Sequence, residues 1–72
     1  MRELKTFFCD DKPTIHDIYE AFDIAKNSGA AVKIEWEVPH NGTYARFITA
    51  DKMEKYTPEK YFEECIPHRY GV

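Results

Sequence analysis

The sequence predicts an α+β fold with the element order β-α-β-β-α: a three-stranded antiparallel sheet, in the strand order 1-3-2, with two helices on one face. Three observations predict it. Residues 14–28 carry apolar side chains at helical spacing, residues 33–49 alternate like a β-hairpin, and residues 57–66 begin with a helix cap. With 72 residues, we expect a single small domain over residues 1–72.

The first expected element is a short strand at residues 3–9, ELKTFFC, which the DDKP segment ends. Phe7 and Phe8 are adjacent within it, so their side chains must point to opposite faces of the sheet. The alternation leaves open which of the two enters the core. The other one lies on the second face.

The second element is a helix at residues 14–28, TIHDIYEAFDIAKNS. Thr14 is placed to cap its N-terminus, and Asp17 completes an approximate capping box. Gly29 follows as a left-handed C-terminal residue. The predicted apolar stripe consists of Ile15, Ile18, Tyr19, Phe22 and Ala25.

The third and fourth elements form a hairpin within KIEWEVPHNGTYARFIT, residues 33–49. Asn41-Gly42 predicts a two-residue type I′ turn, because both central positions of that turn need a positive φ. This turn places Trp36 opposite Phe47, and directly opposed residues share a face. The face assigned to the core holds Ile34, Trp36, Val38, Ala45 and Phe47. The other face holds Glu35, Glu37, Pro39, Tyr44, Arg46 and Ile48.

Pro39 predicts where the first hairpin strand lies in the sheet. Proline cannot donate a ladder hydrogen bond and therefore belongs on a sheet edge. We expect residues 32–38 to be the outer strand and the first strand to add beside residues 43–50, so that both neighbouring pairs are antiparallel. The outer edge could recruit an extended partner segment, but its charged side chains and its proline are more typical of protection against such pairing.

The last element is a helix that begins after Thr57, with Pro58 at its first position, and that ends at Pro67. The preceding residues 51–56, DKMEKY, are left open between a loop and a helical turn. Both helices are expected to cover the sheet face that carries Trp36, so that the other face stays open.

The open sheet face is the first candidate site. Its predicted partner-binding residues are Tyr44, Arg46, Ile48, Glu35 and Glu37. Aromatic side chains and arginine are enriched in protein interfaces. We therefore predict a small non-catalytic protein-binding domain whose partner is another protein or a second copy of the chain in a homodimer. The alternatives are an ordinary solvated face and a surface on which single-stranded bases stack.

Charge and hydropathy limit the partners and the location. Ten Lys and Arg stand against thirteen Asp and Glu, a net charge of −3, whereas broad nucleic-acid binding needs a basic surface. We do not expect nucleic acid as a partner. No apolar run approaches the ~18 residues of a membrane span, and the N-terminus does not resemble a signal peptide. With two cysteines and no disulfide framework, the expected location is cytoplasmic.

The helices carry the second candidate site, an acidic surface that includes Asp17, Glu20 and Asp23. Such a surface could occupy a basic groove on another protein. The alternative function is thus an acidic phage or mobile-element inhibitor that blocks a nucleic-acid-binding enzyme. The similarity to such inhibitors is one of size and charge only, and solvated helix faces explain the same residues.

Neither a metal site nor a catalytic site is expected. Cys65 and His68 have a spacing found in zinc sites, and Cys9 and His16 could complete four ligands. However, Cys65 lies on the apolar side of its helix, where buried free cysteines are common. The same pair lacks an oxyanion hole for nucleophilic catalysis, and the glycines form no phosphate-binding loop. We predict no enzyme activity and no cofactor.

Overall fold

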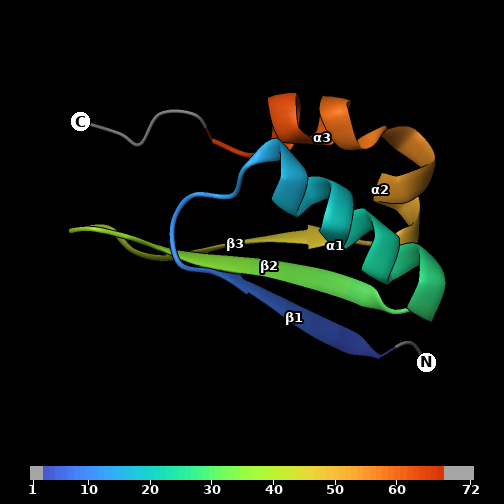
Figure 1. The fold of residues 1–72 in the computed structure, drawn as a ribbon, viewed down its shortest axis with the longest axis horizontal. Coiled ribbons are helices and arrows are strands. Elements are labelled where there is room, and N and C mark those ends of the chain that lie inside the picture. Colours follow the sequence, from blue (N-terminus) through green and yellow to red (C-terminus); the bar gives the residue numbers. More distant parts are fainter. Residues whose placement is uncertain (1–2, 68–72) are drawn as a thin grey trace.

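The chain folds into a three-stranded mixed sheet with three helices in a computed structural model that describes residues 3–67 (Figure 1). The elements follow in the order β1 (Leu4–Cys9), α1 (Ile15–Ser28), β2 (Ala31–Val38), β3 (Gly42–Ile48), α2 (Ala50–Lys55) and α3 (Pro58–Cys65). The predicted α+β class is confirmed. The residues left open between loop and helix belong largely to α2, which makes three helices where two were expected.

The strand order is β1-β2-β3, with β1 parallel to β2 and β2 antiparallel to β3. The predicted antiparallel order 1-3-2 is therefore wrong. Helix α1 returns the chain to the end of the sheet where β1 began, and such a crossover places the next strand parallel to the first. The central strand is β2, and its residues Val32, Ile34 and Trp36 are fully buried. Pro39 lies after β2 ends, in the turn, so it does not require β2 to be an edge.

The hairpin turn is centred on Pro39 and His40, not on Asn41-Gly42. The amide of Asn41 donates a hydrogen bond to the carbonyl of Val38 at 3.0 Å. His40 has a φ of 70°, and it is the one non-glycine residue among those described with a positive φ. Proline followed by a residue of positive φ is the arrangement of a type II turn. The predicted type I′ turn is wrong, because it would need Asn41 to take a positive φ as well.

This turn changes the register of the hairpin. Trp36 is opposite Tyr44, three residues before the predicted Phe47. An odd shift moves every side chain of β3 to the other face of the sheet, because side chains alternate along a strand. Ile48 is consequently fully buried, and Phe47 is 45% exposed. The assignment of Ile34, Trp36 and Val38 to the core is confirmed, whereas that of Ala45 and Phe47 is wrong.

The three helices lie on one side of the sheet (Figure 1). The predicted ends of α1 are confirmed: Thr14 and Asp17 form a capping box, and Gly29 adopts a φ of 71°. Ile18, Phe22 and Ala25 of the predicted stripe are buried. Tyr19 was assigned to the same stripe, but it is 42% exposed and donates a hydrogen bond to the carboxylate of Glu59 in α3. The sheet face opposite the helices remains open.

Helix α3 begins as predicted. The hydroxyl of Thr57 accepts a hydrogen bond from the amide of Lys60 at 3.2 Å, and Pro58 occupies the first turn. Tyr61 brings α3 against α1, since its ring meets that of Phe22 edge to face at a centroid distance of 5.4 Å. The core thus lies between β2 on one side and α1 and α3 on the other.

Candidate functional site

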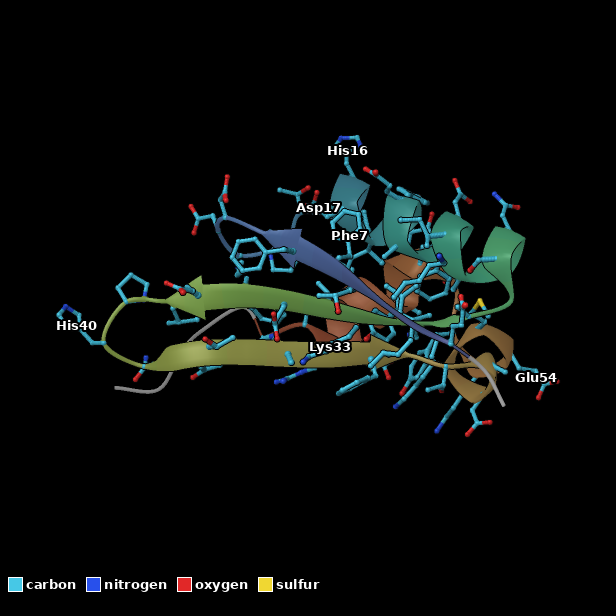
Figure 2. All side chains as sticks on the ribbon, turned by 90° about the horizontal axis from the view of Figure 1, so that it is seen from below. Phe7, His16, Asp17, Lys33, His40 and Glu54 are labelled. Atoms are coloured by element: carbon cyan, nitrogen blue, oxygen red, sulfur yellow. The ribbon has the colours of Figure 1, made fainter. Side chains whose placement is uncertain are left out.

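The open sheet face is the candidate site. The register places on it the side chains that point away from the helices, namely Leu4, Thr6 and Phe8 of β1, Lys33, Glu35 and Glu37 of β2, and Thr43, Ala45 and Phe47 of β3. Figure 2 looks onto this side of the sheet, with Lys33 near its middle. Phe7 lies on the opposite face and packs against the core. Of the two adjacent phenylalanines, Phe7 is thus the one that faces the core, and Phe8 lies on the open face.

Large apolar side chains gather on this face. Leu4, Phe8 and Phe47 are 54%, 56% and 45% exposed. Phe8 stands beside Glu35 of the central strand, and Phe47 stands beside Lys33. Apolar side chains therefore flank the central strand on both sides. Three exposed large apolar side chains thus share one face of the sheet, with the charged side chains of Lys33 and Glu35 between them.

The centre of the face is an ion pair within β2. The Nζ atom of Lys33 lies 2.9 Å from Oε2 of Glu35, and both side chains are about three-quarters covered. An ion pair near the surface contributes roughly 0–1 kcal/mol to stability. Its larger effect here is to cancel the charge at the centre of the face. The phenylalanines on either side then set the chemical character of the surface.

The predicted partner-binding set is split between the two faces. Glu35 and Glu37 lie on the open face, as expected. Tyr44, Arg46 and Ile48 lie on the helix-covered face, so their assignment to the open face is wrong. The cause is the odd register shift that the turn produces. The open face does carry aromatic side chains, but they are Phe8 and Phe47 and not Tyr44.

Arg46 has a structural role on the covered side. Its Nε atom donates a hydrogen bond to the carbonyl of Cys65 at 2.9 Å, at the C-terminal end of α3. A guanidinium at this position also interacts favourably with the helix dipole. One terminal nitrogen donates to the carbonyl of Ala45 at 2.7 Å. Tyr44 lies beside Trp36, with ring centroids 6.0 Å apart.

The acidic candidate residues do not act alike. The carboxylate of Asp17 accepts a hydrogen bond from the amide of Thr14 at 2.8 Å and is part of the helix cap. Glu20 and Asp23 are exposed. Burial and the nearby carboxylates of Asp17, Asp10 and Glu20 raise the pKa of the Cys9 thiol to about 11. Acidic groups therefore gather near the end of β1.

Cys9 is a buried thiol with a raised pKa. The raised pKa keeps Cys9 protonated near neutral pH, where a thiol is a poor nucleophile. Cys65 hydrogen-bonds with Tyr56, which raises the pKa of that phenol. Among residues 3–67, no group of three or more His, Cys, Asp or Glu is placed to hold a metal ion. His68, the fourth residue of the zinc hypothesis, lies outside the described residues.

A hollow of about 540 Å³ lies at one end of the sheet. The loop after β1 and the hairpin turn form its walls, with Asp10, Asp11, Glu37 and His40 among the lining residues. Three of the eight lining residues are acidic. Glu37 lines the hollow and also lies on the open face. The hollow therefore adds negative charge at the turn end of that face.

Comparison with known proteins gives no relative. No family model, no curated protein and no solved structure matches this chain. Within the described part of the chain, no helix has the length and apolar character needed to cross a membrane.

Proposed function

We propose that the protein is a small non-catalytic binding domain that acts through its open sheet face on another protein or on a second copy of itself. One observation carries this proposal. Of the large apolar side chains most exposed among residues 3–67, Leu4, Phe8 and Phe47 share the open face, and Tyr19 lies on α1.

The chemistry of the face suits a protein partner. Burying apolar surface contributes roughly 25 cal/mol per Å², and aromatic side chains dominate the energetics of many interfaces. The Lys33–Glu35 pair offers charged groups of both signs at the centre of the contact, and such groups can fix the position of a partner on the face. The sheet supplies a rigid base for these side chains, so little conformational entropy is lost when they are covered.

The test removes the two aromatic side chains together. We expect Phe8→Ser combined with Phe47→Ser to abolish partner capture from the native host and any self-association seen by light scattering. Both side chains are about half exposed, so the circular dichroism spectrum should be retained. Tyr19→Ser is the matched control, because it removes an exposed aromatic from the helix side and should leave binding intact. Unchanged binding by the double variant would refute the proposal.

The acidic surface supports a second proposal, an inhibitor that blocks a nucleic-acid-binding enzyme through its helix side. The exposure of Glu20 and Asp23 on α1 and the carboxylates near Cys9 favour it. Glu20→Lys with Asp23→Lys should then abolish inhibition, and salt should weaken it, whereas both changes leave the open face untouched. Asp17 is unsuitable for this test because it caps α1. Full inhibition by the charge-reversed variant would exclude this function.

A further inference from the structure

Strand β1 is an edge of the sheet that can accept another strand. Within residues 3–67, β1 pairs with β2 on one side and with no strand on the other. The amide of Ala31 donates to the carbonyl of Glu3 at 3.0 Å, so residue 3 directs its backbone groups toward β2. Because backbone groups alternate along a strand, Leu4, Thr6 and Phe8 direct their N–H and C=O groups outward.

The opposite edge of the sheet is closed by side chains. The outer carbonyls of β3 belong to alternate residues, and two of them are already occupied. The carbonyl of Ala45 accepts from Arg46 at 2.7 Å, and that of Phe47 accepts from the hydroxyl of Tyr61 at 2.8 Å. The side chains of Arg46 and Tyr61 therefore occupy space at this edge that a further strand would need. The edge of β1 is therefore the more accessible of the two.

We infer that two copies of the chain associate through β1, antiparallel, with Thr6 of one copy opposite Thr6 of the other. This deepens the proposed function by naming a second copy as partner, and it rests on the same exposed side chains of β1. The two sheets then form one continuous six-stranded sheet. Leu4 of each copy lies opposite Phe8 of the other, and directly opposed residues share a face and pack against each other.

The register follows from the strand itself. Outward groups at residues 4, 6 and 8 are symmetric about Thr6, so only a pairing centred there joins all of them. A pairing centred on Lys5 would oppose two lysines, which is unfavourable. One centred on Phe7 would place Leu4 opposite Asp10. Pairing at Thr6 brings no like charges into direct opposition, since Lys5 then faces Phe7.

A second copy suits this edge better than an unrelated extended segment. The large apolar side chains stand at the two ends of the outward set, Leu4 and Phe8, and are 54% and 56% exposed. A two-fold axis through Thr6 places Leu4 of each copy against Phe8 of the other copy, so the same contact covers both side chains. It also uses up the free edge of each copy, so that assembly stops at the dimer.

Proline at residue 6 tests this pairing. Thr6→Pro removes an N–H that points outward, so the β1–β2 ladder keeps its own hydrogen bonds. Thr6→Val is the matched control, because it keeps the N–H and the branched shape. By sedimentation over a concentration series, we expect the 8.5 kDa chain to dimerise, Thr6→Val to dimerise similarly, and Thr6→Pro to dimerise at least roughly tenfold more weakly.

Hydrogen exchange gives a second measurement on the unaltered chain. The amides of Leu4, Thr6 and Phe8 should become more protected as protein concentration rises, while those of Lys5 and Phe7 are protected throughout by β2. A chain that stays monomeric at the highest concentration, or a Thr6→Pro variant that dimerises as tightly as the original, would overturn the inference. The proposed function would survive that result if Phe8→Ser with Phe47→Ser still abolished capture of another protein.

Discussion

The hydroxyl of Tyr61 donates a hydrogen bond to the backbone carbonyl of Phe47 at 2.8 Å and so ties α3 to the outer edge of β3. Tyr61 is almost fully buried, and its ring also contacts Phe22 of α1. One side chain thus joins two helices and the sheet. The same hydrogen bond holds Phe47 in a strand whose open face carries the proposed binding surface.

Tyr61→Phe should lower the free energy of unfolding by about 1–2 kcal/mol. The ring packing is kept, but a partly buried carbonyl loses its donor. Urea unfolding at neutral pH measures the difference. Tyr19→Phe is the control, because that hydroxyl is at the surface, and its removal should cost less than about 0.5 kcal/mol. Equal losses in the two variants would contradict a structural role for the Tyr61 bond.

Adjacent residues of β3 should respond very differently to truncation. Ile48→Ala removes a fully buried side chain and should destabilise the fold by about 2–5 kcal/mol, which is comparable to the whole stability that one core of this size supplies. Phe47→Ala removes a larger side chain that is 45% exposed and should cost about 1 kcal/mol or less. Thermal unfolding of the two variants checks the register directly. If Phe47→Ala were the more damaging change, the hairpin would pair as the Asn-Gly turn requires.

The turn predicts opposite effects for glycine at two neighbouring positions. His40 has a φ of 70°, so His40→Gly should stabilise the fold by roughly 0.5–1 kcal/mol through relief of strain. Asn41 does not have a positive φ, so Asn41→Gly should destabilise it by roughly 0.5–1 kcal/mol through added freedom in the unfolded chain. Chemical denaturation of both variants separates the two turn types, since a type I′ turn would favour glycine at Asn41.

The helices could be predicted from sequence because their signals are local. The Thr14 cap, the spacing of Ile18, Phe22 and Ala25, and Gly29 all lie within one segment, and the structure confirms each of them. Their signals do not depend on what the helix packs against. The same holds for the start of α3, where Thr57 caps the first turn.

The sheet order and the hairpin register could not be predicted in the same way. Two turns compete within residues 38–43, and Pro39 with His40 forms the one that the structure adopts. Both faces of β3 carry apolar residues, Phe47 on one and Ile48 on the other, so its alternation does not decide between the registers. The order depends on where α1 returns the chain, which is a tertiary property. The prediction of the site was wrong for the same reason, because the register decides on which face Tyr44 and Arg46 lie.

Cys9 should make stability depend on pH at the alkaline end. Burial, followed by the carboxylates of Asp17, Asp10 and Glu20, raises its pKa from the ordinary value of 9.0 to about 11. A raised pKa in the folded state means that the unfolded chain releases the thiol proton first. The stabilising contribution is therefore fully present below pH 9 and is lost as the pH rises toward 11. Burial raises the pKa of Tyr61 as well, which adds to the loss above pH 10.

Urea unfolding at intervals between pH 8 and pH 10.5 measures this loss, and Cys9→Ala isolates the part that belongs to the thiol. The variant should show a shallower decline between pH 9 and pH 10.5, with only the tyrosine contribution remaining. Cys65 supplies an internal comparison, because it is more exposed than Cys9 and should react faster with a thiol reagent at pH 8. Parallel pH profiles for the original chain and Cys9→Ala would show that the thiol has an ordinary pKa in the folded protein.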